Sequence, residues 1–141
     1  MTSNRIWNGG NRTHVGAGIS PLSRTIGAEV FGLDLAAPLY GREEKRIIRT
    51  LRHRKLICIR RAGLTSLEAE RAAARIARRT ETFRLGGVLA APANLEAASK
   101  LRLVDLDLAA RFGEGRAEVG YEHRWRAGDV LIWTDRLGLA G

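Results

Sequence analysis

The stretch LICIRRAGLTSLEAE, residues 56–70, contains the clearest structural signals in the sequence. Its first four residues, Leu56 to Ile59, form a short apolar run bounded by charged residues, which is typical of a buried strand. Thr65 and Glu68 have the spacing of a capping box, in which each side chain hydrogen-bonds the backbone of the other residue. The stretch therefore predicts a buried strand followed closely by a capped helix that runs to about Arg79.

The apolar face of this predicted helix is weaker than its cap, because the segment is rich in alanine. At helical spacing the face consists of Leu67, Ala73, Ile76 and Ala77.

Upstream of this stretch, the pattern predicts a strand and then a helix. Residues 26–35 alternate loosely and contain strand-forming residues, with a bend at Gly32. Residues 41–55 place Ile47, Ile48 and Leu51 at helical spacing, with charged residues on the other face.

Downstream, only some segments show a clear secondary-structure pattern. Residues 81–92 show no clear period, and a short helix is predicted over 95–101. Residues 101–108, LRLVDLDL, alternate with period two and predict a strand. A loop is expected over 110–120.

The segment from Tyr121 to Trp133 predicts two strands joined by a turn at the Arg-Ala-Gly-Asp sequence. In the first of these strands Tyr121, His123 and Trp125 would project from one face.

The composition indicates a soluble protein with one domain. The chain has 141 residues, of which 45% are hydrophobic and 28% charged. Residues 1–18 are expected to form a flexible arm before a single domain over 19–141. The sequence shows neither an apolar run long enough for a membrane helix nor a signal-peptide core, so a cytoplasmic location is expected.

The net charge of +9 is concentrated in one region. Thirteen of the 24 Lys and Arg residues lie between Arg42 and Arg79 together with four glutamates, so this region carries the whole excess. Arginine-rich stretches can bind phosphates. We favour solvated helix faces instead, because the region has no interleaved aromatic residues, and nucleic acid is not predicted as a partner.

The candidate reactive side chains do not suggest an active site. The single Cys58 lies in an apolar run and is expected to be a buried small hydrophobe. Asp105 and Asp107 would share one face of a strand, most simply its exposed polar face. The three histidines, His14, His53 and His123, are at no metal-ligand spacing. No native metal site is therefore predicted from them.

Two blocks of the sequence resemble a known family. Residues 19–79 contain Ile-Gly-Ala-Glu-Val, Gly-x-Asp-Leu, a helix, a hydrophobic strand ending in Arg, and the Leu-Thr…Glu helix start. Residues 123–136, HRWRAGDVLIWTDR, form the second block. Both are similar to the TauD/TfdA family of Fe(II)- and 2-oxoglutarate-dependent dioxygenases.

The resemblance implies a fold and a chemistry. The expected fold is α+β, a partial double-stranded β-helix of the jelly-roll or cupin-like kind with N-terminal helices and an incomplete barrel. The implied cofactors are Fe(II) and 2-oxoglutarate, and the implied reaction is hydroxylation of a small acidic or sulfonated substrate.

The sequence departs from the family at the residues that would bind the metal. The family uses a 2-His-1-carboxylate triad whose first two ligands are His-x-Asp or His-x-Glu, and this sequence contains neither. The slot for the distal His holds Ala140, and the family's 2-oxoglutarate arginine would lie past Gly141. Only about a dozen residues stand where the family has most of its barrel, so the chain resembles a truncated member.

We therefore predict no catalytic, cofactor-binding or metal-ligating residue, and no activity of this chain alone. The alternative is a non-catalytic remnant or interaction module. A partial barrel leaves open sheet edges, which could pair with another copy or another chain.

Overall fold

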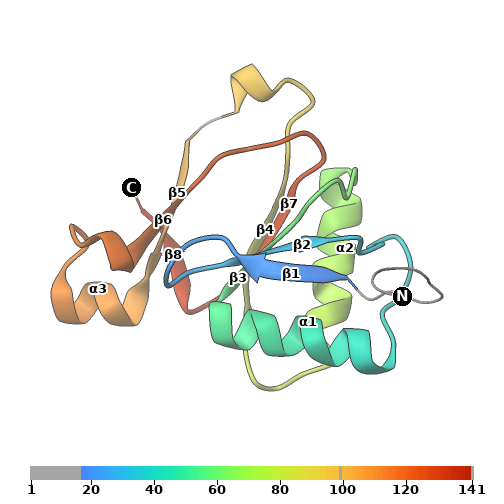
Figure 1. Cartoon of the computed structure of the whole chain (residues 1–141), viewed down its shortest axis with the longest axis horizontal. Helices are drawn as coiled ribbons and strands as arrows, with labels where there is room; N and C mark the ends of the chain where they lie inside the picture. The colour runs from blue at the N-terminus through green and yellow to red at the C-terminus, as the bar shows by residue number, and fades with distance from the viewer. Residues whose placement is uncertain (1–16, 99, 141) are drawn as a thin grey trace, which may run out of the picture.

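A computed structural model describes residues 17–98 and 100–140 of the chain. These residues form a five-stranded sheet, a three-stranded sheet and three α-helices (Figure 1). The elements in chain order are β1 (Gly18–Pro21), β2 (Ala28–Phe31), α1 (Gly41–Arg54), β3 (Leu56–Ile59), α2 (Ser66–Ala77), β4 (Leu85–Ala90), β5 (Leu101–Asp105), α3 (Leu106–Phe112), β6 (Gly120–His123), β7 (Val130–Thr134) and β8 (Leu137–Leu139).

Strand β3 lies at the centre of the larger sheet, whose order is β1-β2-β3-β7-β4. It pairs in parallel with β2 and antiparallel with β7, with Leu56 opposite Trp133 and Ile59 opposite Val130. All four of its residues are fully buried, as the apolar run predicted. The two blocks of sequence that resemble the dioxygenases therefore meet side by side in one sheet.

The larger sheet is covered on both faces. Ile57 and Ile59 of β3 pack with α1 and α2 in one apolar cluster. Leu56 and Cys58 alternate to the other face, where they pack against residues of the smaller sheet such as Leu103. Because both faces are covered, apolar residues occupy all of β3 and the first four positions of β7, which explains the two hydrophobic runs.

Helix α1 confirms the predicted amphipathic helix. Ile47 and Leu51 are fully buried against the sheet. The helix ends at Lys55, which adopts a left-handed conformation with φ of 71° and donates its backbone N–H to the carbonyl of Leu51. This turn delivers the chain directly into β3.

Helix α2 begins with the predicted capping box. The Thr65 hydroxyl accepts from the Glu68 backbone N–H at 3.2 Å, and Glu68 accepts from the Thr65 N–H at 2.9 Å. The predicted apolar face was partly wrong, because Leu67 is 55% exposed. The buried face consists of Ile76 and three alanines, Ala69, Ala72 and Ala73, whose small side chains allow the helix to lie close to the sheet.

The smaller sheet has the order β6-β5-β8. The prediction of one strand over 101–108 was wrong after residue 105, where the chain turns into α3. Asp105 is not on an exposed polar face: its side chain is buried, caps α3 by accepting from the Leu108 N–H, and pairs with Lys55. Asp107 lies on α3 and pairs with Arg136 at the surface.

Two strands carry no recognisable sequence pattern. Strand β4 contains Gly86 and Gly87, so half of its central positions have no side chain to reveal a period. Strand β8 has only three residues. The predicted helix over 95–101 is a single 3₁₀ turn, Leu95–Ala97.

The predicted arm lies outside the described residues except for Ala17 and Gly18. Ala17 is buried, and Gly18 begins β1. Gly32, with φ of +78°, makes the predicted bend directly after β2. The predicted strands around residues 121–133 exist, but β6 and β7 belong to different sheets and Trp125 follows the end of β6.

The α+β class is confirmed, and the described residues form no closed barrel. Within the same residues, no helix has the length and apolar composition that crossing a membrane would require.

Gly87 tests the close packing of β4 on β7. A Cβ atom at this position would overlap the indole ring of Trp133, its neighbour on β7. We expect Gly87→Ala to lower the free energy of unfolding by about 1–3 kcal/mol through overpacking. Urea denaturation would measure this loss.

The matched control is Gly115→Ala, because an added Cβ at Gly115 meets no atom within 4 Å. Its stability should stay within about 0.5 kcal/mol of the parent. An equal effect of the two substitutions would contradict the packing described for β4.

Candidate functional site

The structure separates the histidines that the sequence singled out. His14 lies outside the described residues. His53 is exposed in the last turn of α1. His123, at the end of β6, is buried between the two sheets.

His123 belongs to a cluster of metal-ligand types that the sequence did not predict. One ligand atom each of Cys58, His123 and Asp129 lie within 4.8 Å of one another, and all three residues are buried. Cys58 comes from β3, His123 from β6, and Asp129 from the turn before β7. The pairing of β3 with β7 brings Cys58 close to Asp129, 71 positions later in the chain, and His123 joins them from the smaller sheet.

Asp129 is the centre of the cluster. Its Oδ2 accepts from Arg60 Nη1 at 2.7 Å, from the Arg126 backbone N–H at 2.9 Å, and from His123 Nε2 at 3.1 Å. Burial by itself would raise the pKa of this carboxyl. The hydrogen bonds from His123, Arg126 and Arg60 outweigh that effect and hold the pKa below its ordinary value. Asp129 is therefore an ionised carboxylate whose charge is already balanced.

Both ring nitrogens of His123 are occupied. An ionised carboxylate can only accept, so Nε2 donates to Asp129, while Nδ1 lies 2.7 Å from the hydroxyl of Tyr121. Trp125 stands edge-on to the imidazole, with ring centroids 4.6 Å apart. The ring is thus held in one orientation by three neighbours.

The thiol of Cys58 has low reactivity. Burial is the main reason that the pKa of its thiol rises to about 12, and the negative charge of Asp129 adds to the effect. The thiolate is the form that attacks electrophiles and binds metals. The prediction of a buried small hydrophobe is confirmed, because Cys58 is fully buried.

Arg60 connects Asp129 to strand β2. Its Nε donates to Glu29 Oε1 on β2 at 3.0 Å, while its Nη1 holds Asp129. The guanidinium is only 8% exposed. The network of Glu29, Arg60, Asp129, His123 and Tyr121 therefore ties together β2, β3, β6 and the turn before β7. We name these five residues the polar network.

The residues of this cluster do not fit the Fe(II) site of the dioxygenases. That site needs two histidines and a carboxylate, whereas this cluster offers one histidine with no vacant ring nitrogen. The thiol is protonated, and the Arg60 guanidinium already neutralises the carboxylate by pairing with its Oδ2. One oxygen, Asp129 Oδ1, is buried and has no hydrogen-bond partner among residues 17–98 and 100–140, and it alone supplies no site.

Sequence reasoning missed this cluster because its members are not local. The available signal was the resemblance of both blocks to one family, which implied that residues near 58 and near 129 share a sheet. That signal places the strands but does not predict which side chains meet.

Asp129 is expected to be essential for stability. Asp129→Asn removes the charge that balances buried Arg60, and breaking a buried ion pair costs about 3–5 kcal/mol. Chemical denaturation followed by tryptophan fluorescence would measure the loss.

The matched control is Asp107→Asn, which breaks the exposed pair with Arg136 at 2.8 Å. Exposed pairs contribute about 0–1 kcal/mol. A loss below about 1 kcal/mol in Asp129→Asn would show that the polar network does not hold the sheets together.

Solved structures of dioxygenases share this fold. They include AAD-2 in complex with Mn(II) and N-oxalylglycine (TM-score 0.67, 12% identity, 86% of this chain and 89% of that chain). A taurine dioxygenase from Burkholderia xenovorans has a TM-score of 0.60 at 14% identity, covering 87% of this chain and 82% of that chain. No family model and no curated protein matches the sequence. At these identities the likeness shows the fold, which is that of the TauD/TfdA-like α-ketoglutarate-dependent dioxygenases.

Proposed function

We propose that this protein belongs by descent to the Fe(II)- and 2-oxoglutarate-dependent dioxygenases but that the chain does not catalyse their reaction alone. The class is supported by the shared fold and by the two sequence blocks that meet at β3 and β7. Members of the class hydroxylate small acidic or sulfonated substrates, and such a substrate is the one that a complete site would take.

The observation that carries the proposal is the state of the polar network. A metal-binding carboxylate must direct its charge at the metal, but Asp129 directs its charge at Arg60 and His123. The sequence contains no His-x-Asp or His-x-Glu that could build a second site. These residues stabilise the packing of two sheets, and none of them is arranged for redox chemistry.

Ligand binding tests the proposal without relying on turnover. A ligand that binds only the native state raises the midpoint of thermal unfolding in proportion to RT ln(1 + [L]/Kd). We expect no rise with Mn(II) plus N-oxalylglycine, the pair bound to AAD-2. We also expect no succinate from Fe(II) and 2-oxoglutarate in air, beyond a metal-free control.

Ala140→His is the matched variant, because it restores the residue type at the distal ligand slot while the first two ligands stay absent. It should behave as the parent does in both assays. A clear upward shift of the midpoint, or succinate formation by either protein, would refute the proposal.

A second role, pairing with another chain, is favoured by the open sheet edges. Among the residues that the structure describes, strands β1 and β4 of the larger sheet each have a partner on one side only. Leu89 on β4 is 41% exposed, and Leu139 on β8 is 63% exposed. Edge strands of this kind offer unpaired backbone groups to a further strand.

Sedimentation equilibrium tests this role. We expect a mass above the 15.5 kDa of one chain, and a return toward that mass for Leu89→Lys, because a charge on an edge strand opposes pairing. A parent protein that sediments as a monomer at all concentrations would exclude pairing between copies through β4.

A further inference from the structure

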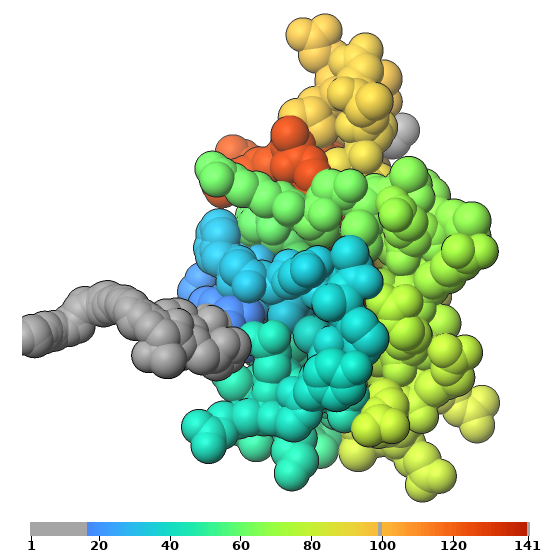
Figure 2. Space-filling view, turned by 90° about the vertical axis from the view of Figure 1, so that its right-hand side faces the viewer, coloured from blue at the N-terminus to red at the C-terminus, as the bar shows by residue number. Residues whose placement is uncertain are grey.

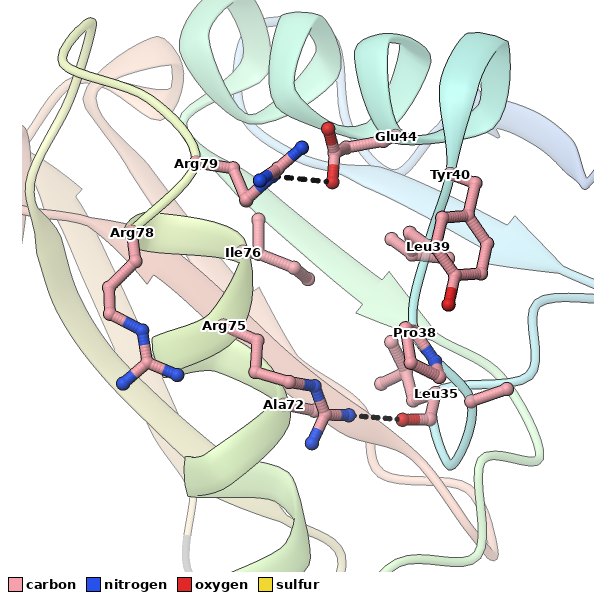
Figure 3. Close-up of a pocket in the computed structure, with 11 residues that line it drawn as sticks. Leu35, Pro38, Leu39, Tyr40, Glu44, Ala72, Arg75, Ile76, Arg78 and Arg79 are labelled. Atoms are coloured by element: carbon pink, nitrogen blue, oxygen red, sulfur yellow. Dashed lines mark hydrogen bonds and ion pairs between the residues drawn. The ribbon is translucent and has the colours of Figure 1, made fainter.

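A hollow on the helical side of the molecule lies apart from the polar network. It is formed between the segment of residues 35–40 and the second half of α2, with the start of α1 at one end (Figures 2 and 3). Its volume is about 270 Å³. This is just below the usual range of small-molecule pockets, so a ligand of about ten non-hydrogen atoms would suit it.

The floor of the hollow is apolar. Ala72 and Ile76 of α2 face Leu35 and Leu39 of the opposite segment (Figure 3). Leu35 and Ile76 belong to the helical core cluster and are 3% and 5% exposed, so the floor is continuous with the core. An alkyl chain or an aromatic ring in this position would be removed from water on several sides.

Arginines surround this floor. Arg75 Nη2 donates to the Leu35 carbonyl at 3.0 Å, and Arg79 Nε donates to Glu44 Oε2 at 3.1 Å. These two bonds cross the hollow and fix both guanidinium groups, whose other N–H groups make no hydrogen bond among the described residues (Figure 3).

Arg78 also lines the hollow, and its side chain makes neither a hydrogen bond nor an ion pair within the part of the chain that the structure describes, but its guanidinium points away from Leu35 and Leu39 (Figure 3). The two guanidinium groups that reach toward the opposite segment, those of Arg75 and Arg79, stand against the single carboxylate of Glu44 and leave a net charge of +1 over the floor. Cations at the end of α2 also suit its dipole, but the dipole does not account for an apolar floor beneath them.

We propose that this hollow binds a small monocarboxylate with an apolar body, such as a short-chain fatty acid or a simple aromatic acid. The fork of a guanidinium group matches a carboxylate, and a preorganised fork loses little entropy on binding. Inorganic anions would leave the floor empty, and neutral apolar molecules would leave the arginines unmatched. The hollow shares no residue with the polar network.

Hexanoate is the probe, with hexanol and inorganic sulfate as the apolar and anionic controls. A dissociation constant on the order of 1 mM is expected for about eight non-hydrogen atoms. Hexanoate is titrated to about twenty times that concentration, and binding is followed by the amide chemical shifts of the isotope-labelled full chain. The amide signals of α2 and of segment 35–40 should shift. Hexanol and sulfate should each bind at least about tenfold more weakly.

Three variants make the test specific. Arg75→Gln and Arg79→Gln should each weaken hexanoate binding about tenfold, because each removes a charged donor. Arg71→Gln is the matched control: it lies exposed on the same helix but outside the hollow, and binding should not change.

The proposal is overturned by no shift at any concentration, by shifts away from the hollow, or by sulfate binding as tightly as hexanoate. It is equally overturned if Arg71→Gln weakens binding as much as Arg75→Gln does, because binding would then depend on the overall charge alone.

Discussion

The pairing of β3 with β7 is the constraint on which the rest of the structure depends. Four residues from each strand form the ladder, and their side chains alternate between two apolar layers. Full burial of each such side chain contributes about 1.5–3 kcal/mol. Neither layer could form without the other, because the strands would then expose one apolar face to water. The helices, the smaller sheet and the polar network all take their positions from this ladder.

Arginine side chains satisfy backbone carbonyl groups at the border of this apolar core. Arg46 donates to the carbonyl of Ala17 at 2.9 Å, and Arg54 donates to the carbonyl of Ser23 at 2.6 Å. Both carbonyl groups belong to residues that flank strand β1. Part of the concentrated positive charge therefore has a structural role. Arg60 is the extreme case, since it is buried with two carboxylates.

Local signals in the sequence predicted the elements that local interactions form. The run Leu56–Ile59, the Thr65–Glu68 box and helix α1 each follow from spacing along the chain. Strand β4 was not predicted because its two glycines, Gly86 and Gly87, give no hydrophobic pattern. The glycines are there to make room for Trp133, a residue nearly fifty positions later. The turn from β5 into α3 escaped because Leu and Asp alternate on both sides of it. Asp105 is buried only because distant Lys55 neutralises it, and the Cys58–His123–Asp129 cluster likewise arises from contacts between distant segments.

The long separation between β3 and β7 also governs when the molecule can fold. A ribosome that has synthesised β3 must add some seventy residues before its antiparallel partner exists. During that time Leu56 to Ile59, an uncharged run with high strand propensity, lacks one side of its ladder. A nascent chain of this protein therefore contains an aggregation-prone segment that stays unpaired on one side until β7 has been synthesised. The charged residues on either side, from Arg52 to Lys55 and at Arg60 and Arg61, act as gatekeepers against association between nascent chains.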